Sequence, residues 1–236
     1  MVMKMTPLKI TFTLGSPICM PNRPLHLDAL VAYINTQKSL FMLDENATKD
    51  DLLALADDLP FKRYEKNGKW VYMASALQPK GSMEKSSRFF TKRNNIGDLC
   101  QAMSSGQVQN KRDKLPHPKM SHKGQLDFNR GHQRNSLMYH PVATIDALEA
   151  YCVGDKDLLC EAFNQGYLTH LGKLRRLGMG FIKEIDITED VHAKENWKCR
   201  VKPFEEEGDV QISSPLHPPY WESRNNTLCF MPSELI

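Results

Sequence analysis

The sequence has no apolar run long enough to cross a membrane, which takes about 20 consecutive residues. Its first twenty residues also make a poor signal peptide and a better first strand, because Lys9, Gly15 and Pro17 interrupt their apolar stretch. No internal repeat or low-complexity tract is present. We therefore expect a protein that has no membrane partner.

Closely spaced cysteines are lacking as well. The six cysteines are scattered, and no two stand at CxxC spacing. A chain of 236 residues is too long to depend on disulfides, so we expect reduced thiols and a cytoplasmic location. Cys100, His117 and His122 occur in an order that loosely suggests zinc ligands, but the close cysteine pair of structural zinc sites is missing. We expect no metal and no other cofactor.

The composition is that of an ordinary globular protein. Hydrophobic residues make up 41% of the chain and charged residues 25%, which argues against a mostly disordered chain. The length is enough to bury a core and allows one large domain, or one domain with a sizeable insertion.

The small net charge of +3 hides an uneven distribution. Residues 80–134 contain twelve Lys and Arg against four acids, a net charge of +8, whereas the remainder of the chain carries −5. Clustered cations of this kind favour contact with a polyanion, because binding releases the counterions condensed on a phosphate backbone. The alternative is a solvated loop that needs its charges to stay soluble.

Hydrophobic periodicity predicts a mixed α+β fold. Strands are expected over 8–14, 136–145 and 181–187, helices over 26–37, 48–59 and 158–167, and a hairpin over 61–77 that turns at Asn67-Gly68. Once the basic insertion is set aside, this order is close to βαββαβ, the ferredoxin-like arrangement.

The most informative segment is LGKLRRLGMGFIKEIDI, residues 171–187. Glycine lets a backbone approach a ligand closely, and Lys and Arg supply charge and, for Arg, bidentate phosphate contacts. The segment has no GxxxxGK[ST] motif, and it follows a helix and opens a strand, the reverse of the dinucleotide-binding order. It suits a sugar-phosphate backbone. The alternative is a glycine-rich turn with solvated charges.

Three segments carry a resemblance to a known family. Residues 172–180, GKLRRLGMG, look like the glycine-rich loop of the CRISPR-associated RAMP superfamily of RNA-binding proteins. The block PLHLDAL at residues 24–30, behind the strand LKITFTLGSPI, resembles more narrowly the type IV (Csf) subunit with a Cas5-like role. The cluster PPYW at residues 218–221 is similar to the same branch.

The resemblance implies a single RAMP domain over residues 1–236, ferredoxin-like (RRM-like) in fold. Residues 80–135 would form its basic, thumb-like insertion, and residues 197–236 a C-terminal extension packing on the same domain. Such a subunit would hold the 5′ handle of the guide RNA and cap the filament of backbone RAMP subunits. It would also dock a large subunit near the target duplex DNA beside the protospacer-adjacent motif.

The candidate RNA-binding residues fall into two groups. The first lies in the glycine-rich loop and comprises Gly172, Lys173, Arg175, Arg176, Gly178 and Gly180. The second lies in the insertion and comprises Arg88, Lys92, Arg93, Lys111, Arg112, Lys114, Lys119, His122, Lys123, Arg130 and Arg134.

Catalysis is the main alternative, because some RAMP relatives are metal-independent endoribonucleases that process repeat RNA. Such cleavage needs a base, an acid and a cation. His26 is the best candidate base, with Arg23 nearby and Tyr33 two turns further on. However, His26 lies among the periodic apolar residues Leu25, Leu27 and Leu30, a position typical of a structural residue. We expect no enzymatic activity.

Further alternatives concern the aromatic residues and the partner. Tyr220 and Trp221 either stack on a base or anchor the core, and the core is favoured. Phe89 and Phe90 either stack on a base or pack between strands. The basic surface would select duplex DNA if the chain contacts DNA beside the large subunit. If the protein were purely a structural bridge within the complex, it would bind no nucleic acid through the loop.

Overall fold

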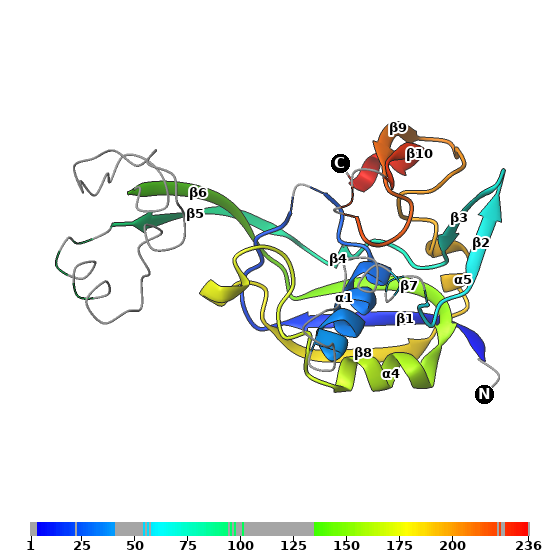
Figure 1. The fold of residues 1–236 in the computed structure, drawn as a ribbon, viewed down its shortest axis with the longest axis horizontal. Helices are drawn as coiled ribbons and strands as arrows, with labels where there is room; N and C mark the ends of the chain where they lie inside the picture. Colours follow the sequence, from blue (N-terminus) through cyan, green and yellow to red (C-terminus); the bar gives the residue numbers. More distant parts are fainter. Residues whose placement is uncertain are drawn as a thin grey trace, which may run out of the picture. The chain divides into compact units, whose positions relative to one another are not determined.

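The computed structural model describes residues 4–21, 23–40, 54, 56, 58–93, 95, 97, 101, 135–220, 222 and 225–235. The chain forms two compact units (Figure 1). Met1–Ser86 and Val142–Ile236 form the larger unit, called the body below, and residues 87–141 form the smaller one, called the ribbon unit. Among the described residues, no helix is both long and apolar enough to cross a membrane.

The body is built on a four-stranded sheet with the order β4-β7-β1-β8, in which every neighbouring pair is antiparallel. The strands are β1 (Met5–Leu14), β4 (Gln78–Lys80), β7 (Ala147–Asp155) and β8 (Ile182–Glu189). In β1, Leu8, Ile10 and Phe12 are fully buried, while Lys9 and Thr11 between them are only partly buried. The predicted period of two is confirmed.

Two helices pack on the apolar face of this sheet (Figure 1). They are α1 (Leu27–Leu40), which follows β1, and α4 (Lys156–Asn164), which follows β7. Asp155 caps α4, because its carboxylate accepts hydrogen bonds from the first-turn amides of Asp157 and Leu158. Phe163 of α4 meets Phe12 edge-on, with ring centroids 5.6 Å apart. The helices predicted over 26–37 and 158–167 are confirmed.

The predicted hairpin forms, but outside the central sheet. Among the described strands, β2 (Arg63–Lys66) and β3 (Lys69–Tyr72) pair only with each other, and Asn67 and Gly68 take the positive φ angles of a tight hairpin turn. The central sheet uses the three-residue strand β4 instead. It also contains β7, which the sequence patterns did not reveal. The expected contribution of the hairpin to the central sheet is therefore wrong.

A second apolar cluster packs the C-terminal segment onto the hairpin. It contains Val71 of β3 and Trp197, Val201, Phe204, Leu216, Cys229 and Met231. The segment includes helix α5 (Ala193–Asn196), strands β9 (Asp209–Ser214) and β10 (Thr227–Pro232), which pair with each other, and the 3-10 turn η5 (Ser233–Leu235).

The remaining strands, β5 (Glu84–Lys92) and β6 (Ser136–Thr144), pair to form a two-stranded ribbon. The predicted strand over residues 136–145 is thus confirmed. The predicted helix over 48–59 and the insertion beyond residue 101 lie largely or wholly outside the described residues.

Candidate nucleic-acid interface

The glycine-rich loop, residues 171–180, joins the C-terminal side of α4 to strand β8 and is tied to the chain that follows β1. The amide of Lys173 donates to the carbonyl oxygen of Cys19 at 2.8 Å, and the amide of Gly180 donates to that of Pro17 at 2.9 Å. Both ends of the loop are therefore held by backbone hydrogen bonds to the segment that follows β1.

Ser16 adds a side-chain connection to the same loop. Its hydroxyl donates to the carbonyl oxygen of Gly178 at 2.8 Å and accepts from the amide of Phe181 at 2.9 Å. The amide of Gly15 also donates to the carbonyl oxygen of Phe181. These contacts preorganise the turn into β8, so a ligand that binds there loses little affinity to ordering the loop.

The three glycines of the loop serve different purposes, although all have φ near +70°. A Cβ on Gly172 would lie 2.5 Å from the Cys19 carbonyl oxygen, and one on Gly180 would lie 2.1 Å from that of Leu171. These two glycines allow close backbone packing within the body. A Cβ on Gly178 would meet no described residue within 4 Å, so among these residues the glycine has open space in front of it. Gly178 is where an external ligand can approach the backbone.

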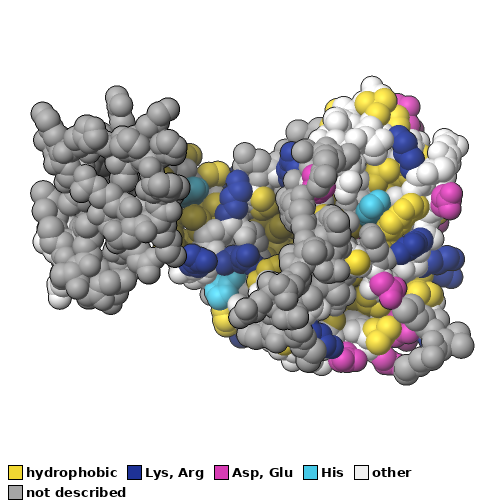
Figure 2. All heavy atoms as spheres, in the orientation of Figure 1, with side chains coloured by type: hydrophobic (Ala, Val, Ile, Leu, Met, Phe, Trp, Pro, Cys, Tyr) yellow, Lys and Arg dark blue, Asp and Glu magenta, His cyan; other side chains and the backbone are white. Residues whose placement is uncertain are grey.

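The three predicted cations lie around a short 3-10 turn, η3 (Arg175–Leu177), and all three are exposed. The guanidinium of Arg175 lies over the ring of Tyr33 from α1, 5.0 Å from its centroid. This contact restrains the side chain of Arg175 at the surface. Figure 2 shows cationic, acidic and apolar side chains interspersed over the described residues on one face of the molecule.

The ribbon unit supplies further exposed cations and aromatics. Arg88, Lys92 and Arg93 are exposed. Phe89 and Tyr139 of β6 meet edge-on, with ring centroids 5.3 Å apart. Both rings stay at the surface, because Phe89 is 65% exposed and Tyr139 is 58% exposed. The ribbon therefore presents aromatic surface beside cations. The other predicted insertion residues lie outside the described residues: Lys111, Arg112, Lys114, Lys119, His122, Lys123, Arg130 and Arg134.

A comparison with family models shows what kind of protein carries this loop. The model described as CRISPR type IV associated protein Csf3 matches residues 6–232, nearly the whole chain. The chain belongs to the Csf3 family. It is therefore a type IV CRISPR-associated protein, and the glycine-rich loop lies within the matched region. A comparison with curated proteins found no significant match.

In this Csf3 family member, the candidate base His26 is enclosed. It is 3% exposed and its ring stacks on that of Tyr220, with centroids 4.6 Å apart and planes 21° apart. Burial and the nearby positive charge of Arg200 lower the pKa of His26 well below its usual value, so the ring is neutral at pH 7. Its Nδ1 has no hydrogen-bond partner among the described residues. Tyr33, the other residue considered for catalysis, lies under the guanidinium of Arg175.

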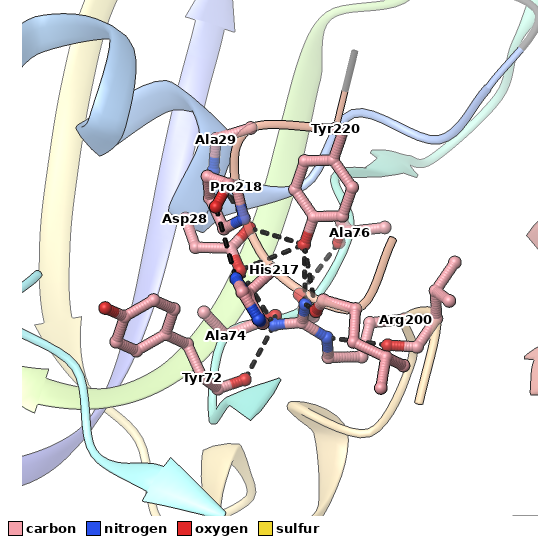
Figure 3. Close-up of polar contacts among 12 residues, drawn as sticks. Asp28, Ala29, Tyr72, Ala74, Ala76, Arg200, His217, Pro218 and Tyr220 are labelled. Atoms are coloured by element: carbon pink, nitrogen blue, oxygen red, sulfur yellow. Dashed lines mark hydrogen bonds and ion pairs between the residues drawn. The ribbon is translucent and has the colours of Figure 1, made fainter. Parts of the chain in front are cut away.

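Next to His26 is a buried ionic cluster that sequence reasoning missed (Figure 3). Asp28 and Arg200 are both fully buried, and their Oδ2 and Nη1 atoms are 3.1 Å apart. The Tyr220 hydroxyl accepts from Arg200 Nη2 at 2.6 Å and donates to the Asp28 carboxylate at 3.0 Å. Burial raises the pKa of Asp28, and the charge of Arg200 limits the rise. The position of Tyr220 supports its interpretation as an anchor, whereas Trp221 lies outside the described residues.

Arg200 also binds backbone oxygen atoms from several parts of the body. Its guanidinium donates to the carbonyl oxygens of Tyr72, Ala74, Val201 and Leu216 at 2.6–2.9 Å. Every nitrogen of this guanidinium therefore has a partner, so Arg200 is a structural residue. No sequence signal marked it, because a single Arg in a polar C-terminal segment is ordinarily a surface residue. The described residues contain no group of three or more potential metal ligands.

Proposed function

We propose that this Csf3 family member is a non-catalytic RNA-binding subunit of a type IV CRISPR complex. In this proposal it holds the 5′ handle of the guide RNA and caps the filament of backbone subunits. The observation that carries the proposal is the preorganised glycine-rich loop, which presents Lys173, Arg175 and Arg176 beside the open backbone at Gly178. Exposed cations next to an approachable backbone suit a chain of phosphates.

The strand order supports a RAMP domain with a Cas5-like role. Helices α1 and α4 follow the two central strands, β1 and β7, of an antiparallel sheet ordered β4-β7-β1-β8. We interpret this as the ferredoxin-like βαββαβ arrangement, with the basic insertion entering between β4 and β7 in the position of a thumb.

The surroundings of His26 support the absence of catalysis. A general base must reach the proton that it removes, and His26 is buried under Tyr220. The other residue considered for catalysis, Tyr33, packs under a loop cation. We therefore propose that repeat RNA is cleaved by another protein.

The proposed partners are the guide RNA, the backbone RAMP subunits, a large subunit and the target duplex DNA near the protospacer-adjacent motif. Several apolar side chains remain exposed in the separate chain, among them Leu177, Val191 and Leu228. Apolar surface of this kind suits contacts with other subunits of a complex.

The test is binding of the purified protein to a repeat-derived 5′-handle RNA over a salt series. The loop variant combines Lys173→Ala, Arg175→Ala and Arg176→Ala. The control variant replaces three other exposed cations of the body, Lys4, Lys62 and Lys194, and so has the same net charge. For a single strand, each lost phosphate contact should flatten the plot of log affinity against log salt by about 0.7. We expect the loop variant to lose up to about 2 in slope and the control to keep the wild-type slope.

Three results would contradict the proposal. If the loop variant keeps the wild-type slope, the glycine-rich segment is only a turn. If RNA product appears without added metal and disappears with His26→Ala, the protein is an endoribonuclease. A preference of the wild type for duplex DNA over handle RNA would point instead to a DNA contact.

A further inference from the structure

A cavity of about 640 Å³ lies in the body between helix α1 and the C-terminal segment. Its lining is mostly apolar, and the volume lies within the range of pockets that bind small organic groups. The α1 residues in the lining include Ala29, Tyr33 and Thr36, and β9 contributes Ile212, Ser213 and Ser214. None of the residues that define the proposed phosphate site lines this cavity, so it is a separate feature of the body.

The walls combine flat rings with polar groups. Tyr33, His26 and Tyr220 are all in the lining, together with several prolines. His26 is buried, and its Nδ1 has no hydrogen-bond partner among the described residues. A planar ligand with hydrogen-bonding groups on its edge would match such walls. Unstacked nucleobases are recognised in this way, by aromatic or histidine rings and by hydrogen bonds to their edges.

The cavity is next to the loop cations, because Tyr33 lines the cavity and also contacts Arg175. The ring of Tyr33 lines the cavity, and the guanidinium of Arg175 lies 5.0 Å from its centroid. A second cation, Arg23, is exposed and also lines the cavity, where its Nη1 donates to the carbonyl oxygen of Tyr220 at 3.3 Å. One cation in the lining and a second next to it complement a phosphodiester strand and not an apolar peptide.

We infer that this cavity receives one unstacked nucleobase from the RNA strand whose phosphates bind the glycine-rich loop. The inference rests on the proposed RNA binding and adds a base-reading site to it. Arg175 would contact a phosphate. Tyr33, whose ring lies under the Arg175 guanidinium, would contact the base inserted into the cavity. Affinity would then depend on one particular nucleotide, whereas phosphate contacts alone are insensitive to the base.

The test uses a set of repeat-derived 5′-handle RNAs, each lacking the base at one position. Wild type is compared with Ala29→Phe, which fills the cavity from α1 without changing a charge. Gln37→Phe is the control, because Gln37 lies on the same helix and outside the cavity lining. Ser213→Tyr fills the cavity from the opposite wall at an exposed position and so guards against misfolding of the first variant.

We expect wild type and Gln37→Phe to lose about 5- to 100-fold in affinity when one particular base is removed. The cavity-filled variants should bind the intact RNA as weakly as wild type binds that abasic RNA, and show no further loss with it. Their salt slope should stay at the wild-type value. The inference is wrong if no abasic RNA binds more weakly than the intact one, or if filling the cavity leaves RNA affinity unchanged. Loss of binding to a partner subunit with RNA affinity intact would also overturn it, since the occupant would then be a protein side chain.

The two proposals fail in different ways. An unchanged salt slope in the loop variant removes the proposed RNA site itself. A flattened slope in the loop variant, combined with wild-type abasic sensitivity in the cavity-filled variants, removes only the base-reading site.

Discussion

At the scale of single residues, the burial of His26 beside Arg200 governs how the imidazole titrates. A protonated ring there would lose its hydration and face a fully buried guanidinium, so the folded state keeps His26 neutral. In the unfolded chain the same residue takes up a proton near pH 6.5. Because only the unfolded state binds this proton, acidification stabilises the unfolded state.

We predict that the free energy of unfolding falls as the pH drops below about 6.5, and that His26 contributes up to about 1.4 kcal/mol per pH unit to this fall. Replacing it by phenylalanine (His26→Phe) should remove that contribution. Urea denaturation at pH 7.5, 6.5 and 5.5 measures the difference. Gln37→Phe serves as the control, because it introduces the same side chain without removing a titratable group, and it should keep the wild-type pH dependence. An identical pH dependence in His26→Phe would show that this ring is accessible to protons in the fold.

At the scale of elements, the glycine-rich loop combines a part that is packed and a part that is open. Gly180 lies against the backbone of Leu171, where a side chain has no room, whereas none of the residues that the structure describes fills the space in front of Gly178. Both residues have positive φ, which disfavours any side chain. Glycine therefore allows close packing at Gly180 and leaves the backbone accessible to a ligand at Gly178.

We predict that Gly178→Ala costs about 1–2 kcal/mol of stability, from its left-handed backbone alone. Gly180→Ala should cost about 3 kcal/mol or more, because the Leu171 carbonyl must also move. The midpoints of urea denaturation measure both values. Equal costs for the two substitutions would show that the loop does not pack against itself as the structure has it.

The elements also differ in how readily a sequence reveals them. Strands β1 and β8 alternate apolar and polar residues because each has one buried face, and both were predicted. Strand β7 was missed because most of its residues are buried on both of its faces, so it has no clean alternation. Strand β4 has only three residues, too few for any period to appear.

At the scale of the whole body, the Asp28–Arg200–Tyr220 cluster joins segments that are remote in sequence (Figure 3). Asp28 begins helix α1, and Arg200 binds backbone oxygens of the β3 strand end and of the C-terminal segment. The cluster therefore holds both apolar cores in one unit. Removal of one partner leaves a fully buried charge without compensation.

We predict that Asp28→Asn destabilises the protein by about 3–5 kcal/mol. Asp186→Asn changes the net charge equally at an exposed position and should alter stability by less than about 0.5 kcal/mol. Chemical denaturation of the two variants gives the comparison. A small effect of Asp28→Asn would mean that Arg200 is held by its carbonyl contacts alone.

Local patterns were sufficient to predict α1, α4, β1, β8, the Asn67-Gly68 turn and the cationic glycine-rich loop. Each of these signals depends on residues within a few positions of one another, where backbone geometry dictates which neighbours share a face. The position of Tyr33 under Arg175, the enclosure of His26 and the cavity between α1 and β9 depend on packing between distant segments. Tyr220 and Asp28 are 192 residues apart in the chain, and no spacing rule links them. Only the closure of the body around both cores brings their side chains into contact and makes a buried ionic cluster stable there.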